Sequence, residues 1–522
     1  MTSCPRELHM RTLPVRNPVC LVFFLLILLA AGPARAQQGT VQAAVAPAPA
    51  PGNYHAAASD ADALRVELLS IVTDPKLTRA HTGLYVKDLS TGQVLLDRNS
   101  ELLFIPASTL KLFTTAAAIS LLGPSYTYKT PLLLDGVVEG DTLHGNLVVR
   151  GSGDPSISGV FHGDKPLTVF TAWAQQLRQR GIQRISGDLI GDASLFPGPP
   201  LGMGWNWDDE SYWYAAQTGA LAFNESTADV SVTADGKPGD PVGYEVEPVA
   251  GYLNVDNEAV VGAPKSGSSF VAERRHGENV LAMTGELPRG SRTGFACTVE
   301  GPADWFLFAL RSVLEANGVY VVGQSRVVTD PRETTGWSNA TQAAVYTSPP
   351  VSELVTFTNR KSHNFYAEQL LKTIGATRRN LGTARAGAEA VMSWASGLGV
   401  NRKGLEMVDG SGLSRMNLVS PRAMVALLEG MRGSGNFQAF YDSMPVAGCH
   451  GSLTNRMCNT PAEDVAHAKV GFVTHDICLA GYTRDKRGGW YAYALFVNNH
   501  TGPVRDAKAM QDAVVAALSA VE

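Results

Sequence analysis

The stretch FIPASTLKLFTTAAA, Phe104–Ala118, constrains the fold and the chemistry of this chain more than any other. Ser108 and Lys111 stand three residues apart at the start of an apolar run, and Pro106 just ahead of them is typical of a helix start. The run from Leu110 to Leu122 contains no proline or glycine that would break a helix. Because residues i and i+3 lie on one face of a helix, the spacing predicts that the amine of Lys111 reaches the hydroxyl of Ser108.

This pair has a chemical interpretation and a plain one. A serine hydroxyl is a weak nucleophile until a neighbouring base takes its proton. Lysine can act as that base when burial lowers its pKa, as an apolar helix environment would do. The alternative is a serine near a helix start followed by a solvated lysine, because Ser-x-x-Lys also occurs by chance. The rest of the chain has to decide between the two.

Composition limits the classes of protein to consider. The chain has 522 residues, of which 45% are hydrophobic, so it can bury a sizeable core and form several domains. A formal charge of −5 gives no reason to expect nucleic-acid binding. No group of cysteines and histidines has the spacing of metal ligands, so we predict neither a metal nor another cofactor.

The N-terminus has the pattern of a targeting segment. Three arginines precede the apolar run Val19–Ala31, and Ala34–Ala36 supplies an A-x-A cleavage site. The run is shorter than the roughly 20 residues that span a bilayer. We therefore predict a signal peptide over residues 1–36, a flexible linker over 37–59, and a secreted or periplasmic protein without a stable membrane anchor. An uncleaved N-terminal anchor is the alternative.

Cleavage at that point leaves four cysteines, Cys297, Cys449, Cys458 and Cys478. In an oxidising compartment they could pair in three ways, and the sequence does not decide between them. The closeness of Cys449 and Cys458 around a turn-rich stretch favours that pair.

The order of predicted elements indicates an α+β fold with an insertion. A helix over 60–73 and a hairpin over 81–97 precede the Ser108 helix, and residues 351–522 run from helices to strands and a final helix. Residues 130–350 are rich in short strands and turns. We predict that 60–129 and 351–522 form one domain, with 130–350 as one or two inserted accessory domains, because an unstructured loop of that length is implausible.

Two later motifs complete a set of three. Ser362–Asn364 is a Ser-x-Asn element between helical segments, and Lys469–Gly471 opens a predicted strand. With Ser108 and Lys111 ahead of them, the chain resembles the penicillin-binding proteins and serine β-lactamases, in which Ser-x-x-Lys, Ser-x-Asn and Lys-(Ser/Thr)-Gly follow in this order.

Two other stretches imitate these motifs. Lys265–Gly267 fits the third pattern by letter, but it precedes every plausible Ser-x-Asn element. Ser434–Asn436 copies the second pattern but lies in a Gly-rich linker rather than between helices. Order and context therefore favour Ser362–Asn364 and Lys469–Gly471.

Longer segments narrow the resemblance. The chain is similar to low-molecular-mass class C penicillin-binding proteins, the D-alanyl-D-alanine carboxypeptidase/endopeptidase family of the DacB type, from about Asp60 to its end. The segments that carry this similarity are NRKSHNFYAEQLLK, MVDGSGLSRMNLVSP, MPVAGCHGSLTNRM, AKVGFVTHDICLAGY and, in the insert, GWNWDDESYWYAAQTGALAFNES. The resemblance implies a transpeptidase-like domain with an antiparallel sheet flanked by helices. β-Lactamases lack such an insert.

Carried over residue by residue, the resemblance implies five catalytic roles. Ser108 matches the acylated nucleophile, and Lys111 matches the base that activates it. Ser362 matches the hydroxyl that relays a proton to the leaving group, and Asn364 the amide that holds the substrate backbone. Lys469 matches the cation that orients the terminal carboxylate of the substrate.

The resemblance also implies substrate-binding positions. Backbone N–H groups of Ser108 and of the strand after Gly471, near Val473, would form an oxyanion hole. An aspartate of the insert would meet the far ammonium group of diaminopimelate in the stem peptide. In GWNWDD that residue is expected to be Asp209, with Asp208 as the alternative.

One position departs from the family pattern. Val470 stands where the family has Thr or Ser, whose hydroxyl helps to bind the substrate carboxylate, and valine cannot donate a hydrogen bond. A missing partner of a charged group costs about 1.5–3 kcal/mol, or roughly ten- to a hundred-fold in rate. Ser411 or Thr474 is a candidate to compensate.

The predicted function is that of a serine DD-peptidase. It would act on peptidoglycan stem peptides as a carboxypeptidase, as an endopeptidase, or as both, and β-lactam antibiotics would inhibit it. One alternative is a serine β-lactamase. The other is a catalytically decayed cell-wall binding protein, in which Val470 marks the lost activity.

Overall fold

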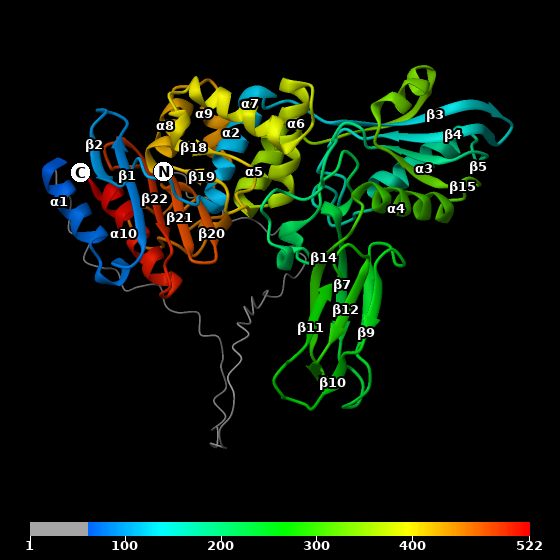
Figure 1. Ribbon diagram of the computed structural model, residues 1–522, viewed down its shortest axis with the longest axis horizontal. Helices are drawn as coiled ribbons and strands as arrows, with labels where there is room; N and C mark the ends of the chain where they lie inside the picture. Colours follow the sequence, from blue (N-terminus) through cyan, green and yellow to red (C-terminus); the bar gives the residue numbers. More distant parts are fainter. Residues whose placement is uncertain (1–60) are drawn as a thin grey trace.

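Both ends of the chain build one antiparallel sheet in the computed structural model, which describes residues 61–522. The strand order is β2-β1-β22-β21-β20, so strands from the start and the end of the chain lie side by side (Figure 1). The strands are β1 (His81–Asp88), β2 (Val94–Arg98), β20 (His467–Val473), β21 (Asp476–Arg484) and β22 (Trp490–Asn498). Strand β20 is an edge strand, with β21 on one side only.

Helices cover both faces of this sheet. Helices α1 (Ala61–Val72) and α10 (Val504–Ala520) share one apolar cluster with one face of it. A second cluster forms between the other face and a group of helices around α2 (Figure 1). That group comprises α2 (Lys111–Leu121), α5 (Val351–Lys361), α6 (Asn364–Arg379), α7 (Ala384–Ser396), α8 (Pro421–Arg432) and α9 (Phe437–Asp442).

Helix α2 is the central helix of the second cluster. Every residue from Lys111 to Ile119 is buried, as expected for a helix whose side chains are apolar or small on all sides. The small side chains of Ala116, Ala117 and Ala118 let neighbouring helices come close, and α5 and α6 both pack against α2. The predicted helix around Ser108 and Lys111 is therefore confirmed, and it is a core element.

The segment between these two parts forms sheets of its own. A seven-stranded sheet contains the path β15-β5-β4-β3-β17, with β6 and β16 attached to it, and α3 and α4 pack against it. Its elements are β3 (Lys129–Glu139), β4 (Thr142–Arg150), α3 (Thr168–Gln179), β5 (Arg184–Ile185), β6 (Leu189–Asp192), α4 (Pro302–Ala316), β15 (Tyr320–Val321), β16 (Ser325–Val328) and β17 (Thr341–Thr347).

Smaller sheets form a unit that extends away from the rest of the molecule (Figure 1). Two have three strands, in the orders β14-β7-β8 and β11-β12-β9, and β10 pairs with β13. The strands are β7 (Thr227–Thr233), β8 (Gly243–Glu247), β9 (Asn254–Asn257), β10 (Val260–Gly262), β11 (Val271–Arg274), β12 (Val280–Thr284), β13 (Glu286–Pro288) and β14 (Arg292–Thr298).

The sheets confirm the predicted α+β class. From the arrangement of these sheets we propose that residues 60–129 and 351–522 form one domain and that residues 130–350 are inserted into it. One apolar cluster runs through the seven-stranded sheet and the extended unit together. The insert thus has a core separate from the cluster around α2.

The predicted signal peptide and linker lie outside the described residues. Among residues 61–522, no helix combines the length and the apolar character needed to cross a membrane.

The favoured disulfide, Cys449–Cys458, is wrong. Cys458 carries a free thiol, as do Cys297 and Cys478. The sulfur of Cys458 lies 3.5 Å from the carbonyl oxygen of Thr454, within its own turn. Closeness in sequence did not bring the two sulfurs together, because the chain between them forms a 3-10 turn at Gly451–Leu453 instead of a simple hairpin.

Candidate active site

Ser108 lies in a 3-10 turn, Ala107–Leu110, that leads directly into α2. Asn498 at the end of β22 fixes the approach to this turn. Its side chain accepts a hydrogen bond from the N–H of Ile105 (2.8 Å) and donates one to the carbonyl of the same residue (3.1 Å). Ala107 has a φ of 46°, a left-handed conformation that costs a non-glycine residue about 1–3 kcal/mol. The surrounding contacts therefore hold Ser108 in a strained turn.

Lys111 connects Ser108 to two other parts of the chain. Its Nζ lies 2.9 Å from Oγ of Ser108, 2.6 Å from Oδ1 of Asn364 and 2.7 Å from the carbonyl oxygen of Ser411. The side chain is fully buried. Burial lowers the pKa of Lys111 to about 7, although the carboxyl groups of Asp409 and Glu368 act in the opposite direction.

The neutral form of Lys111 suits this geometry. A neutral amine has two N–H donors and one lone pair, whereas an ammonium has three donors and no acceptor. Asn364 and Ser411 each offer an oxygen that can only accept. The lone pair of the neutral amine is then left for the O–H of Ser108, which is the arrangement that a general base requires.

The Ser-x-Asn element joins two helices at the site. Helix α5 ends at Ser362, whose φ of 57° turns the chain, and α6 begins at Asn364. The amide of Asn364 accepts from Lys111 through Oδ1 and donates through Nδ2 to the carbonyl of Tyr214 (2.8 Å). Asn364 therefore links Lys111 to the inserted region.

Lys469 reaches Ser362 from strand β20. Its Nζ donates to Oγ of Ser362 (2.8 Å) and to the carbonyl of Val470 (2.9 Å). Burial, with the nearby charge of Lys111, lowers the pKa of Lys469 well below its usual value. A carboxylate of a bound substrate would supply the missing countercharge. The structure thus brings all five predicted catalytic side chains into two hydrogen-bonded groups.

Gly471 allows β20 to pass directly against the Ser108 turn. A Cβ at this position would lie 2.6 Å from the carbonyl oxygen of Pro106 and 3.1 Å from the backbone nitrogen of Thr109. Real Cβ atoms do not approach a carbonyl oxygen that closely. The absence of a side chain at Gly471 therefore allows the close approach of the strand to the Ser108 turn.

The backbone alternation of β20 changes the predicted oxyanion hole. The N–H of Ala468 donates to the carbonyl of Pro445 (3.0 Å), on the side of β20 away from β21. N–H groups two residues apart point to the same side of a strand, so the N–H of Phe472 also points to the free edge. Val473 pairs with Asp476 across a two-residue turn. The N–H of Val473 therefore points towards β21, whereas the N–H of Phe472, one residue before it, faces the free edge.

Ser411 takes part in the site through its backbone. Its carbonyl accepts from Lys111, its hydroxyl accepts from the N–H of Leu413 (3.2 Å), and the side chain is fully buried. The predicted substrate contact by this hydroxyl stays a prediction, and the contact that the structure shows with Lys111 is made by the carbonyl of Ser411. Val470 itself packs, half-buried, against the apolar cluster under α1 and α10.

Asp209 lies next to the site on the inserted region. It ends a short 3-10 turn, Trp207–Asp209. Its Oδ1 accepts from the hydroxyl of Tyr214 (2.8 Å) and its Oδ2 from the amide of Asn206 (3.1 Å). Because the carbonyl of Tyr214 binds Asn364, which in turn binds Lys111, three hydrogen bonds separate the Asp209 carboxylate from Lys111.

Sequence reasoning missed two buried carboxyl groups behind Lys111. Glu368 accepts from the N–H groups of Gly410 (2.9 Å) and Ser411 (2.7 Å), so it orients the carbonyl that Lys111 contacts. Burial, with the neighbouring Asp409, raises the pKa of Glu368 to about 7. Glu368 follows Asn364 by one helical turn, and a polar residue on the buried face of an apolar helix was a signal in the sequence.

Asp409 is the second of these groups. It accepts hydrogen bonds from the N–H of Gly412 (2.8 Å) and of Ser414 (2.7 Å), and from the indole of Trp205 (3.0 Å). It therefore folds the Gly/Ser turn around itself and ties that turn to the inserted region. The sequence showed the turn but not the direction of the Asp409 side chain.

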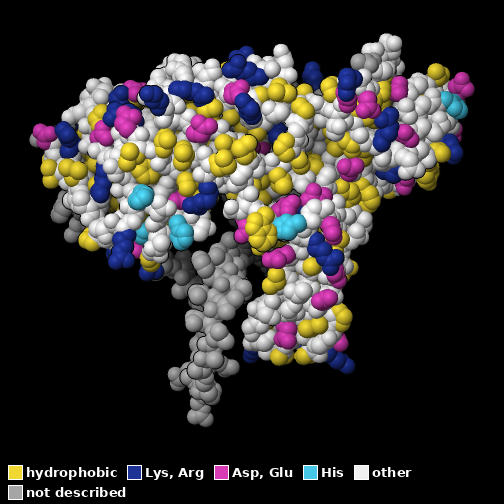
Figure 2. All heavy atoms as spheres, in the orientation of Figure 1, with side chains coloured by type: hydrophobic (Ala, Val, Ile, Leu, Met, Phe, Trp, Pro, Cys, Tyr) yellow, Lys and Arg dark blue, Asp and Glu magenta, His cyan; other side chains and the backbone are white. Residues whose placement is uncertain are grey.

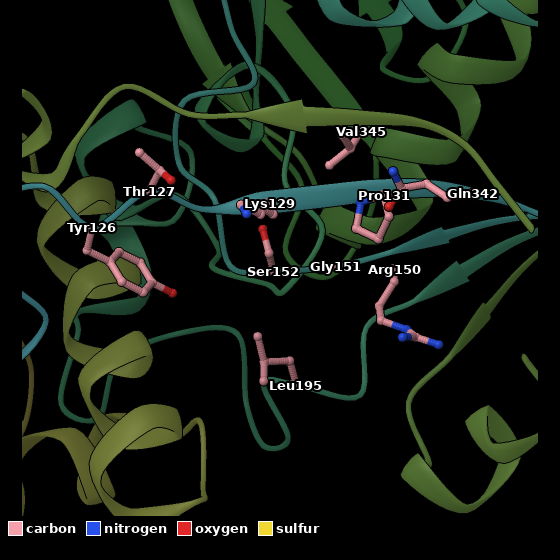
Figure 3. A pocket seen from close by; sticks show the side chains of 10 residues that line it. All are labelled: Tyr126, Thr127, Lys129, Pro131, Arg150, Gly151, Ser152, Leu195, Gln342 and Val345. Carbon is pink, nitrogen blue, oxygen red and sulfur yellow. The ribbon is translucent and has the colours of Figure 1, made fainter. Parts of the chain in front are cut away.

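The structure also contains a cavity of about 450 Å³ at the seven-stranded sheet (Figure 3). Lys129 and Arg150 bring two positive charges to it. Its wall contains none of the predicted site residues. The cavity is lined by Tyr126, Thr127, Lys129, Pro131, Arg150, Gly151, Ser152, Leu195, Gln342 and Val345.

Comparison with known proteins agrees with this geometry. The D-Ala-D-Ala carboxypeptidase 3 (S13) family matches residues 64–521. A D-alanyl-D-alanine carboxypeptidase of Actinomadura sp. is 35% identical over 471 residues, which cover 87% of this chain and 84% of the relative. The D-alanyl-D-alanine carboxypeptidase DacB of Haemophilus influenzae is 26% identical over 81% of this chain and 86% of its own length.

Among solved structures, penicillin binding protein 4 (dacB) from Haemophilus influenzae is similar to this one. The match has a TM-score of 0.74 and 25% sequence identity, and it covers 86% of this chain and 97% of that one. The similarity therefore includes the inserted region as well as the domain that carries Ser108.

Proposed function

The chain belongs to the D-Ala-D-Ala carboxypeptidase 3 (S13) family and is a serine-type D-Ala-D-Ala peptidase, and on that premise we propose that its substrates acylate Ser108. One observation carries the assignment of the residue. The buried amine of Lys111 lies 2.9 Å from Oγ of Ser108 and has a pKa lowered by burial to about 7. A lysine in this state is a base at neutral pH.

In the proposed acylation, the lone pair of Lys111 takes the proton of Ser108 as Oγ attacks the carbonyl carbon of the penultimate D-Ala. The developing oxyanion would accept from the N–H groups of Ser108 and Phe472. Collapse breaks the C–N bond to the terminal D-Ala. The leaving nitrogen takes up the proton that Lys111 removed from Ser108, and we assign the relay to Ser362, which accepts a hydrogen bond from Lys469. Lys111 is then neutral again before deacylation.

Deacylation completes the proposed cycle. A water molecule gives its proton to Lys111 and attacks the ester carbonyl, so the shortened peptide leaves and Ser108 regains its proton. The same steps cleave a cross-link when the leaving amine belongs to diaminopimelate. We propose both activities, with Lys469 binding the carboxylate next to the scissile bond and Asp209 or Asp208 meeting a distant ammonium group.

We place this reaction outside the cytoplasm. Peptidoglycan stem peptides are found there, and the proposal agrees with the signal peptide expected over residues 1–36. β-Lactam antibiotics would acylate Ser108 in place of the peptide.

The experiment that tests the assignment is labelling with a fluorescent penicillin, followed by mass spectrometry of the digested protein. We expect one stable adduct, on the peptide that contains Ser108. Ser120→Ala, a change to the serine of the adjoining helix α2, is the matched control and should label normally. An adduct on another residue, or none on folded protein, would contradict the assignment. Rapid release of hydrolysed drug would favour a β-lactamase.

The pH dependence of acylation should follow the deprotonation of Lys111. Because the pKa of Lys111 is lowered to about 7, the neutral form becomes more abundant as pH rises towards that value. The rate of penicillin acylation should therefore increase between pH 5 and pH 7 and level off above it. Stopped-flow fluorescence across this range is the measurement, and a rate that falls with rising pH would exclude Lys111 as a neutral base.

Val470→Thr should restore the missing hydroxyl. We expect kcat/KM for peptides with a terminal D-Ala carboxylate to rise by about tenfold, since a hydrogen bond to a charged group contributes about 1.5 kcal/mol or more. Val470→Ala, which shortens the side chain without adding a donor, is the control. An equal gain in both variants would assign the effect to packing.

A further inference from the structure

Large aromatic side chains remain exposed on the inserted region beside the site. Trp207 is 74% exposed, Tyr212 43% and Trp213 40%. They stand within seven residues of one another, on the segment that also provides Asp209. Exposed aromatic groups clustered in this way are uncommon on a surface that binds nothing.

Contacts with the catalytic domain hold this segment in place. The indole of Trp205 donates to Asp409, and the ring of Trp213 lies 5.3 Å from that of His363, between Ser362 and Asn364. The carbonyl of Tyr214 accepts from Asn364. The exposed rings are therefore continuous with the proposed peptide site, and they extend from it onto the insert.

One edge of the Trp207 ring is held in place by a neighbouring side chain. Its ring lies 5.1 Å from that of His276, tilted by 61°, just beyond the end of β11. His276 contacts the carboxylate of Glu210, which lies 3.5 Å from the buried guanidinium of Arg274. This edge contact orients the indole and leaves most of its surface in solvent. In Figure 2, hydrophobic, acidic and histidine side chains gather above the extended β unit, on the wall of a hollow beside the sheet domain.

The chemistry around the rings selects an uncharged ligand with many hydroxyl groups. Trp and Tyr rings offer flat apolar faces that match the C–H face of a pyranose. Asp208, which is exposed, and Glu210 stand next to Trp207 and can only accept hydrogen bonds when ionised. Hydroxyl and acetamide N–H groups would satisfy them, whereas an anionic ligand would be repelled.

We propose that Trp207, together with Tyr212 on the same segment, binds the N-acetylated sugar to which the stem peptide is attached. This deepens the proposed function and rests on it. An extended peptide of four residues reaches about 13–14 Å, so the sugar must lie at the rim of the site when D-Ala is at Ser108. The segment that carries the rings borders the site, because its residues Tyr214 and Trp213 contact Asn364 and His363.

Kinetics with two substrates test the proposal. D-Ala release is measured from a pentapeptide and from the same pentapeptide attached to its disaccharide. We expect kcat/KM to be about tenfold higher with the disaccharide, in line with the contribution of one aromatic contact. Trp207→Ala should remove this preference and leave the free pentapeptide unchanged. Tyr320→Ala, another exposed aromatic at 59%, on β15, should keep it.

A binding measurement separates this proposal from the peptidase assignment. Calorimetry with an N-acetylglucosamine trimer, which has no peptide, should give saturable binding that Trp207→Ala abolishes and Tyr320→Ala retains. Absence of binding, or binding that Trp207→Ala leaves intact, overturns the proposal whatever the labelling of Ser108 shows. Co-sedimentation with phosphatidylglycerol vesicles that depends on Trp207, without sugar binding, would assign the rings to a membrane surface and would also overturn it.

Discussion

Ser108→Ala and Lys111→Met should each lower kcat for D-Ala release by about a millionfold, and the double variant should lose no more than either single one. In serine hydrolases, nucleophile and base act as a unit, so removing one already removes most of the benefit of the other. Here the two groups share one hydrogen bond of 2.9 Å. The expected result is therefore a strongly non-additive double-mutant cycle.

Lys111→Met removes the amine of the side chain but keeps most of its packing volume. Methionine fills much of the volume of the buried lysine stem and adapts to irregular space. It leaves the oxygens of Asn364 and Ser411 without their donor, at a cost of about 1–3 kcal/mol each. Thermal unfolding of both single variants is the control for this loss. If the two rate losses multiplied in the double variant, Lys111 would not be the base for Ser108.

The local part of the site could be predicted from the sequence. The contact between Ser108 and Lys111 depends on one helical turn, and helical spacing fixes it before any tertiary structure is known. The order of the three motifs added Ser362, Asn364 and Lys469 to the predicted site. The family resemblance indicated that these distant residues come together, which helical or strand periodicity cannot do. The fold class followed from the same two sources.

Two details of the site depend on the direction of backbone groups and on strand register. Whether the N–H of Phe472 or of Val473 faces the free edge depends on how β20 pairs with β21, and a shift of one residue reverses the answer. The sequence does not contain that register. Ser411 presents a similar choice: a Gly/Ser turn can present either its hydroxyl or its carbonyl to Lys111, and Glu368, on a helix distant in sequence, orients the turn.

A single methyl group added to β20 at Gly471 should strongly lower the rate of substrate turnover. Gly471→Ala is expected to lower kcat/KM by about a hundredfold, the usual effect of misplacing reacting groups by about 1 Å. The new Cβ would meet the carbonyl oxygen of Pro106 at 2.6 Å. That oxygen cannot move away easily, because the N–H (3.2 Å) and the hydroxyl (2.6 Å) of Thr109 both donate to it.

The strand must therefore shift, and the shift acts on two groups at once. Lys469 and Phe472 lie within two residues of Gly471 on β20, so the proposed carboxylate anchor and the proposed oxyanion donor would both move relative to Ser108. Overpacking should also lower stability by about 1–3 kcal/mol, so rates are measured well below the Tm of the variant. Gly435→Ala is the matched control, because a Cβ there meets nothing within 4 Å. A wild-type rate for Gly471→Ala in a folded protein would mean that substrate turnover does not depend on the close approach of β20, and the proposed roles of Lys469 and Phe472 would fall with it.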